Sequence, residues 1–197
     1  MLAPAFADPV GASQAVFRAV MDAVASPGTI VATGRLVQAP QPLGLAAAAV
    51  ALTLLDYETP VWLDPALARS PEIVGWLRFH TGAPVTDDPR QATFGFIANP
   101  PLMPQFEAFS QGSMEYPDCA ATLVLQIDRL SDNGGFCLSG PGIRGSRAFS
   151  AAPLPADFVV RMRANRALFP RGLDIILASG ATLAALPRSV HVDTERS

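Results

Sequence analysis

The order of helix-like and strand-like segments is the feature that most limits what this chain can fold into. In the first half, segments with apolar residues at helical spacing alternate with short apolar runs bounded by turn residues. The helical segments are residues 13–28, 43–55 and 70–82, and the strand-like segments are residues 29–37, 60–64 and 92–98. Hairpin signals crowd the second half. This pattern predicts an α/β fold, a three-layer α/β/α sandwich around a mixed sheet.

Local signals place individual elements within this pattern. Ser13 is the expected N-cap of the first helix, and Ser70, with Pro71 after it and Gly82 past the end, brackets a later one. In the second half we expect a strand at 120–130 and a helix at 155–172. The remaining expectations are a turn at "SDNGG" (131–135) closing a hairpin with 136–140, a strand at 173–180, a short helix and an edge strand within 181–192, and a disordered tail at 193–197.

Length and composition bound the class of protein. A chain of 197 residues with no internal repeat or long linker is expected to form a single domain over residues 1–197. Its longest apolar run, residues 43–55, is shorter than the ~18 to 20 residues of a membrane span and predicts a buried helix. The first thirteen residues lack the features of a secretion signal, so we expect a soluble, cytoplasmic protein with no membrane partner.

The chain has few charged residues, and this limits the kinds of partner that it is expected to bind. The net charge of -3 argues against a nucleic-acid binder. Half of the residues are hydrophobic and only 16% are charged, which is expected of a chain that covers part of its surface with a partner, and also of a core-rich monomer.

The sequence contains no lysine, and all 14 positive residues are arginine. A genomic composition bias would explain this, but the chemical consequence holds either way. A pyridoxal phosphate Schiff base and a P-loop both need a lysine, so we expect neither, and no cofactor. Cys119, Cys137, His80 and His191 are scattered along the chain, so we expect no metal site and two buried free thiols.

Residues 138–149, "LSGPGIRGSRAF", match the dinucleotide pattern G-x-G-x-x-G at Gly140, Pro141, Gly142 and Gly145. A dinucleotide loop opens a helix directly, whereas prolines postpone the next helix here by about ten residues. The alternative is a turn whose glycines need positive φ. A third reading keeps Arg144 and Arg147 as contacts to an anion or to a partner protein. These two belong to a group of six arginines, at positions 144, 147, 161, 163, 166 and 171, of which 161 and 163 are expected on the solvated side of their helix.

The stretch "SQGSMEYPDCAATL" (110–123) is the second unusual loop, because Glu115 and Asp118 flank a Tyr-Pro pair just before the best strand. A carboxylate pair is suited to acid–base chemistry if the geometry converges, and a role in turn and capping structure is the simpler alternative. A serine hydrolase is not supported, because no G-x-S-x-G occurs and neither histidine has an evident serine partner. His80 is expected near a helix C-terminus, where partial positive charge on the imidazole is favourable.

Taken together, several blocks of the sequence resemble the PhnH family, the H subunit of the carbon–phosphorus lyase system of phosphonate metabolism. The blocks are residues 17–30, 50–64, 79–85, 138–143 and 169–192, in the same order as in the family. A further block resembles the family's "GT-x-E-x-P" at Gly112, Ser113, Glu115 and Pro117, with serine in place of threonine.

This resemblance implies a fold similar to the large domain of pyridoxal-phosphate-dependent transferases, without the cofactor site. It also implies a subunit of the carbon–phosphorus lyase core complex, with the G, I and J subunits as partners and a homodimer when isolated. With an ATPase-like partner, that complex attaches methylphosphonate to the ribose of ATP, giving alpha-D-ribose 1-methylphosphonate 5-triphosphate. The nucleosidase chemistry is attributed to the I subunit and the later radical cleavage to the J subunit.

The family supplies no catalytic residue, so a scaffolding subunit is the expected role. The alternative is a stand-alone nucleotide- or phosphate-ester-dependent enzyme that uses Glu115 with Arg144 or Arg147. The block at Gly112, Ser113, Glu115 and Pro117 and the turn at Gly140, Pro141 and Gly142 are expected near a subunit interface.

Overall fold

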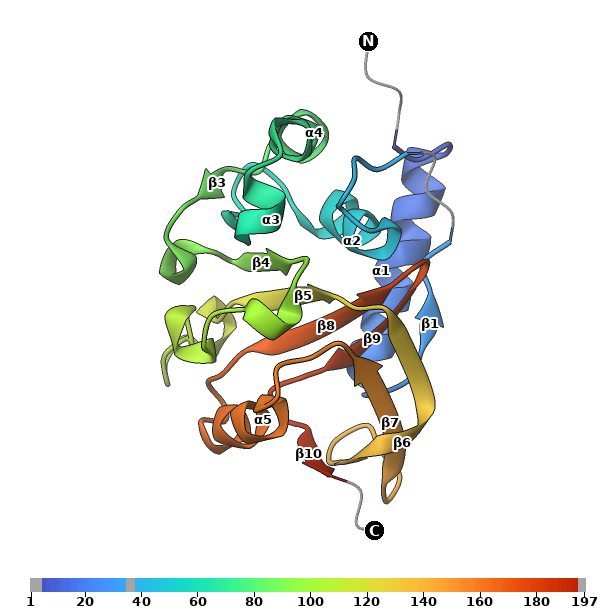
Figure 1. Ribbon diagram of the computed structural model, residues 1–197, viewed down its shortest axis with the longest axis vertical. Helices are drawn as coiled ribbons and strands as arrows, with labels where there is room; N and C mark the ends of the chain where they lie inside the picture. Colours follow the sequence, from blue (N-terminus) through green and yellow to red (C-terminus); the bar gives the residue numbers. More distant parts are fainter. Residues whose placement is uncertain (1–4, 35–37, 195–197) are drawn as a thin grey trace.

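The computed structural model describes residues 5–34 and 38–194, so what the sequence predicts for 35–37 and 195–197 lies outside the described residues (Figure 1). A central sheet has the strand order β1-β9-β8-β5-β4-β2-β3. Its strands are β1 (Val31–Ala32), β2 (Val61–Leu63), β3 (Val85–Thr86), β4 (Phe94–Ile97), β5 (Thr122–Gln126), β8 (Asp174–Ser179) and β9 (Thr182–Leu186). Strands β3, β2, β4, β5 and β8 are parallel, whereas β9 runs antiparallel to β8 and β1 antiparallel to β9. The predicted α/β fold with a mixed sheet is confirmed.

Helices cover one face of this sheet and mixed structure covers the other (Figure 1). The helices are α1 (Pro9–Ala25), α2 (Leu45–Leu54), α3 (Pro65–Ala68), α4 (Pro71–Thr81) and α5 (Phe158–Ala167). Helices α1 to α4 pack on the first face. The second face carries α5 together with a small antiparallel sheet in the order β10-β6-β7. Its strands are β6 (Arg129–Ser139), β7 (Arg147–Ala152) and β10 (His191–Thr194). The outer layer on this side therefore combines one helix with strands, where the sequence predicts helices alone.

The alternation of side chains along the central strands explains the two cores. Val124 of β5 and Ile176 of β8 lie in the core beneath the helices. Their neighbours Leu123 and Ile175 lie in the core beneath the small sheet and α5. Because successive strand residues point to opposite faces, a strand buried on both sides must be apolar throughout, as these strands are.

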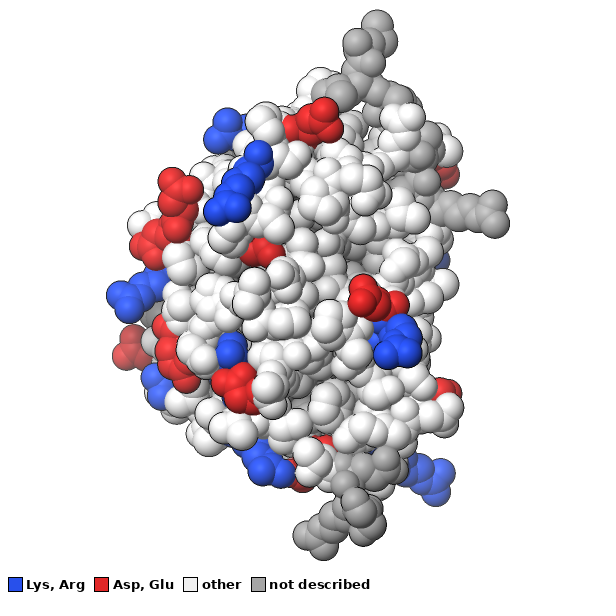
Figure 2. All heavy atoms as spheres, viewed as in Figure 1, with Lys and Arg blue, Asp and Glu red and all other residues white. Residues whose placement is uncertain are grey.

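Helix α2 is the predicted buried helix. Its residues 46–51 are at most 1% exposed, so the helix is apolar on all sides. Within residues 5–34 and 38–194, no helix combines the length and the apolar character needed to cross a membrane. Figure 2 shows one face of the molecule, on which the charged side chains gather mostly near the margin.

Helix α4 is bounded as predicted. Ser70 accepts a hydrogen bond from the Ile73 N–H, and Gly82 ends the helix with a left-handed φ of 72°. Helix α1 begins earlier than predicted, because Asp8 rather than Ser13 is the N-cap and accepts from the Gly11 N–H. Pro9 at the first helical position extends the element by one turn.

Three predictions for the second half are wrong. "SDNGG" does not close a hairpin: it lies within β6, which shifts register between Ser131 and Gly135 as it pairs with β7. The short helix expected near 182–186 is strand β9, because Gly180 turns the chain back along β8. Residues 193–194 of the expected tail belong to β10. In the first half, only 31–32 of the strand expected at 29–37 is strand within the described residues.

Candidate functional site

The two loops singled out from the sequence lie at the same end of the molecule. Residues 110–121 lead into β5, so they lie at the amino ends of the parallel strands. Strand β6 runs back across the sheet, and the 140–146 loop that follows it meets the end of α1. The third segment at this end is 187–190, which follows β9 and contacts both loops. The structure therefore brings the two loops into one cluster, joined by a segment that the sequence analysis did not select.

Arg188 holds the cluster together. Its guanidinium makes a forked contact with the Asp174 carboxylate, with 2.6 Å between Nη2 and Oδ2 and 3.2 Å between Nε and Oδ1. Its backbone N–H donates to Asp174 Oδ1 at 2.8 Å, and Nη1 donates to the carbonyls of Pro117 and Pro170. The Arg188 side chain is only 15% exposed, so this ion pair is partly desolvated.

The neighbouring residue completes the connection. The Ser189 carbonyl lies 3.2 Å from the position that a Cβ on Gly140 would occupy, and Gly140 has a φ of 123°. The sequence around Arg188 does not reveal its role, because its partners lie 14 to 71 residues away. No local pattern marks an arginine whose contacts are all made by distant segments.

The 110–121 loop is closed by its own backbone and side chains. Gln111 and Ala120 form an isolated β-bridge at its base. The Ser113 hydroxyl accepts a hydrogen bond from the Tyr116 N–H at 2.9 Å, and Gly112 adopts a φ of 68° against the Tyr116 carbonyl. Gly112 and Ser113 therefore serve the turn itself.

The tip of this loop is exposed. Met114 is 67% and Tyr116 is 62% exposed, and Glu115 between them is exposed as well. Within the described residues, the carboxylates of Glu115 and Asp118 have no hydrogen-bond or ion-pair partner. The loop presents an apolar and acidic tip and lacks the convergent partners that an acid–base pair requires.

The 140–146 loop is a hairpin turn. It joins β6 to β7, and no helix follows it. Positive φ occurs at Gly140, Gly142 and Gly145, with values of 123°, 80° and 74°. A Cβ on Gly142 would lie 2.1 Å from the Ala25 carbonyl oxygen at the end of α1. This geometry matches the turn interpretation and is not the strand–loop–helix unit of a dinucleotide site.

The two arginines of this loop differ. Arg147 donates through Nη1 to the carbonyls of Ser26 and Pro27 and to the Thr29 hydroxyl, and so fastens β7 to the turn after α1. Arg144 is exposed. Arg147 therefore stabilises the fold, whereas Arg144 faces solvent.

The arginines of α5 only partly follow the prediction that they are solvated. Arg161 is 10% exposed: it pairs with Asp157 at 2.8 Å and donates to the Pro104 carbonyl at 3.0 Å, so the prediction is wrong for it. The hydrogen bond from this guanidinium lowers the pKa of the Asp157 carboxyl. Arg163 is solvated as predicted, at 57% exposure, and pairs with Asp193.

The cysteines and His80 also depart from expectation. Cys119 is exposed and Cys137 half-buried, so the prediction of two buried thiols is wrong. His80 lies in the last turn of α4, but burial against the Trp76 and Phe79 rings lowers its pKa, which favours the neutral imidazole over the expected partial charge. Within the described parts of the chain, no three of His, Cys, Asp and Glu come together as a metal site.

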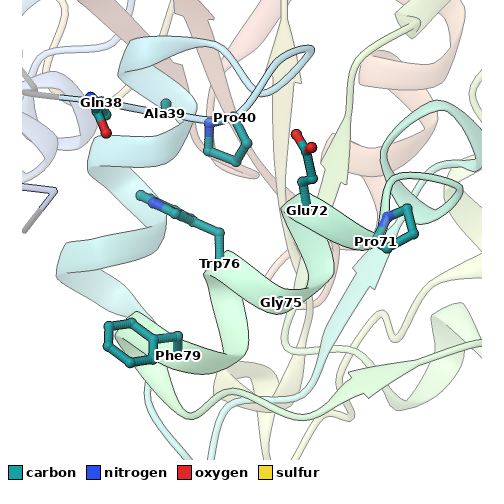
Figure 3. Close-up of a pocket in the computed structure, with 8 residues that line it drawn as sticks. All are labelled: Gln38, Ala39, Pro40, Pro71, Glu72, Gly75, Trp76 and Phe79. Carbon is teal, nitrogen blue, oxygen red and sulfur yellow. The ribbon is translucent and has the colours of Figure 1, made fainter. Parts of the chain in front are cut away.

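A large cavity lies elsewhere, beside α4 (Figure 3). It has a volume of about 650 Å³ and is lined by Gln38, Ala39, Pro40, Pro71, Glu72, Gly75, Trp76 and Phe79. In Figure 3 the Trp76 ring points from α4 toward the Gln38–Pro40 segment, and Phe79 lies one turn further along the helix. Phe79 is 64% exposed, and Glu72 is the one charged residue among the described residues of the lining. The described residues of the lining thus form an uncovered apolar groove without converging polar groups.

Comparisons with known proteins agree with one another. Residues 4–193 match the family described as bacterial phosphonate metabolism protein (PhnH). The chain is 42% identical over 191 residues to the alpha-D-ribose 1-methylphosphonate 5-triphosphate synthase subunit PhnH of Rhizobium meliloti, covering 97% of this chain and 95% of that protein. It is 33% identical over 82 residues to the putative C-P lyase subunit protein HtxG of Stutzerimonas stutzeri, covering 42% of each chain.

Proposed function

This chain belongs to the PhnH family of bacterial phosphonate metabolism proteins, and we propose that it is a subunit of an alpha-D-ribose 1-methylphosphonate 5-triphosphate synthase. The observation that carries the proposal is the 42% identity that extends over 97% of the chain. The role is to support formation of that triphosphate from ATP and methylphosphonate in organophosphonate catabolism, in the cytoplasm. The partners are the G, I and J subunits of the carbon–phosphorus lyase core complex.

We propose that this subunit acts as a scaffold without a catalytic residue of its own. The cluster around Arg188 lies at the amino ends of the parallel strands, whereas α/β enzymes bind their ligands at the carboxyl ends. The Arg188 and Arg147 guanidinium groups are engaged by protein oxygens. We further propose that the fold resembles the large domain of pyridoxal-phosphate-dependent transferases without the cofactor site, and the absence of lysine supports the missing cofactor site.

The loops at this end are the proposed contacts with other subunits. The exposed Met114 and Tyr116 flank Glu115 at the tip of a loop that a β-bridge closes at its base. Arg144 is exposed on the neighbouring turn. Tyrosine, methionine and arginine are enriched in protein interfaces. A rigid loop also loses little conformational entropy when a partner binds it.

We further propose that the isolated chain forms a homodimer through α1. Val10, Phe17, Met21 and Val24 form an outward apolar stripe on this helix, and their exposed fractions are 69%, 49%, 51% and 37%. Around a two-fold axis near Met21, Phe17 would face Val24 of the second copy, and Arg18 would face Asp22 of that copy. The stripe and its flanking charges are thus self-complementary.

Co-expression with the G, I and J subunits, followed by size-exclusion chromatography with light scattering, tests the subunit role. We expect a stoichiometric complex that contains this chain. The double variant Glu115→Arg with Tyr116→Ala should weaken its retention, while Tyr57→Ala, which alters an aromatic residue that is 74% exposed elsewhere, should not.

Failure of the chain to enter any complex would overturn the scaffold proposal. The alternative enzyme, using Glu115 with Arg144 or Arg147, would then predict saturable nucleotide binding by the isolated chain. That binding should be lost in the double variant Arg144→Met with Arg147→Met, with circular dichroism showing whether the variant is folded.

A further inference from the structure

A crevice lies at the carboxyl ends of the parallel strands, away from the loops proposed as subunit contacts. The connection from β2 to β3 passes through α3 and α4 on one face of the sheet. The connection from β4 to β5 passes through short 3₁₀ turns at Pro100–Leu102, Phe106–Ala108 and Pro117–Cys119. Met103, Phe106 and Phe109 of this connection belong to the core on the opposite face. Figure 1 shows α3 on one side of β4 and the light-green turns that follow β4 on the other.

The neighbouring strands β2 and β4 therefore form a topological switch point. In open α/β sheets, ligands bind in the crevice outside the carboxyl ends of the strands at such a point. A cavity of about 330 Å³ lies there, within the size range of small-molecule sites. It is lined by Trp62, Asp64, Pro65, Ala66, Arg69, Asn99, Leu102, Met103 and Pro104.

Asp64 builds the wall of this crevice. It is 4% exposed, and its two oxygens accept hydrogen bonds from the N–H groups of Leu67, Ala98 and Asn99 at 2.9 to 3.0 Å. These bonds tie the end of β2 to the end of β4 and to α3. Because three N–H donors already surround the carboxylate, Asp64 is poorly placed to coordinate a cation.

The free polar groups of the crevice are Arg69 and Asn99. Both are exposed, and among residues 5–34 and 38–194 neither side chain has a hydrogen-bond or ion-pair partner. Apolar surface surrounds them: Met103 and Trp62 are buried, and Leu102 is 80% exposed at the rim. One cation, one amide and an apolar wall together suit an anion that carries an apolar group.

We propose that this crevice binds a small organic anion, a phosphonate or carboxylate with an apolar substituent. Arg69 holds the anionic group, Asn99 donates its amide N–H to it, and the substituent lies against Trp62, Met103 and Leu102. The larger groove beside α4 is less suited, because Glu72 in its lining would repel an anion. This proposal does not depend on assembly with other subunits.

The test is titration of the ¹⁵N-labelled full chain with phenylphosphonate, followed by ¹H–¹⁵N correlation spectra. We expect saturable shifts at the Trp62 indole and at the Arg69 and Asn99 amides. Inorganic phosphate lacks the apolar group and benzyl alcohol lacks the charge, so both should bind at least about tenfold more weakly, the effect of losing one favourable contact. Benzoate compared with phenylphosphonate then distinguishes a carboxylate from a phosphonate ligand.

Two variants locate the site. Arg69→Met should weaken phenylphosphonate binding by about tenfold, the effect of one charge-assisted hydrogen bond. Arg78→Met, which removes an exposed arginine of α4 outside the crevice, should leave the affinity unchanged. The amide spectrum of each variant reports whether it is folded. Absence of saturable shifts, equal binding by inorganic phosphate, or equal affinity in folded Arg69→Met would overturn the proposal.

Discussion

At the scale of single residues, Gly142 is a position with no room for a side chain. It combines a φ of 80° with a hypothetical Cβ only 2.1 Å from the Ala25 carbonyl oxygen, so Gly142→Ala must displace either the turn or the end of α1. Gly145→Ala is the matched control, because Gly145 has a φ of 74° but nothing within 4 Å of its Cβ position. In urea unfolding we expect a loss of about 1 kcal/mol for the control, from φ strain alone, and about 3 kcal/mol or more for Gly142→Ala. Equal losses would contradict the close approach to α1.

Arg188 offers a second test at this scale, since it connects Asp174 and Pro117 across the amino end of the sheet. Arg188→Met leaves a partly buried carboxylate and a carbonyl without their donor, so we expect a loss of roughly 3 kcal/mol in the free energy of unfolding. The Arg163–Asp193 pair is the control: both side chains are 57% exposed, and Arg163→Met should cost less than about 1 kcal/mol. If the two variants lose the same stability, the Arg188 cluster is no more than a surface ion pair.

At this scale, the sequence predicts the backbone conformation of the glycines but not the contacts of the arginines. The positive φ of Gly140, Gly142 and Gly145 could be predicted, because closely spaced glycines in a tight turn indicate it. The roles of Arg147 and Arg188 could not, because their acceptors are mostly backbone carbonyls from distant segments. A carbonyl acceptor is present at every residue and so leaves no compositional signal.

At the scale of elements, α4 carries His80, whose pKa is lowered by burial. Burial holds the pKa of His80 below its ordinary value of 6.5, so between the two values the unfolded chain binds more protons than the folded chain. Stability should therefore be fully present above pH 6.5 and decline as the pH falls toward the folded-state pKa. In thermal unfolding between pH 7.5 and pH 5.5, His80→Gln should reduce this loss, whereas His191→Gln, at an exposed site, should not. An unchanged pH dependence in His80→Gln would show that the imidazole is not desolvated.

Sequence patterns predict an element when the signals that define it are local. Helix α4 was predicted at both ends because its caps are local: Ser70, Pro71 and Gly82 lie within or beside it. The prediction of a helix where β9 lies is wrong for the opposite reason: the contacts that define this element are not local. Its "TLAAL" segment is a strand because it pairs with β8 from Ile175 to Ser179, and alanine and leucine alone favour a helix. Long-range pairing overrode local propensity there, as it did in the 11-residue strand β6, which absorbs the "SDNGG" turn signal as a bulge.

At the scale of the whole molecule, the two proposed protein contacts lie on different exposed surfaces. The loops near Arg188 are proposed for other subunits, and the stripe on α1 for a second copy of this chain. The small ligand crevice lies at the opposite ends of the strands from those loops. Because the N-cap of α1 is Asp8 rather than Ser13, the helix includes Val10, which extends the apolar stripe by a further exposed side chain.

The homodimer can be tested through its own symmetry. Light scattering of the isolated chain should give twice the monomer mass of 20.7 kDa. Arg18→Asp and Asp22→Arg should each shift the chain toward monomer, because every two-fold pairing would then place like charges opposite one another. The double variant restores opposite charges across the axis and should recover the dimer, a rescue that a general loss of folding would not produce. Val160→Glu, at a site on α5 that is 64% exposed, is the control and should remain dimeric. A dimer that withstands both single variants would move the contact away from α1, and a monomeric wild-type chain would leave the stripe to another subunit.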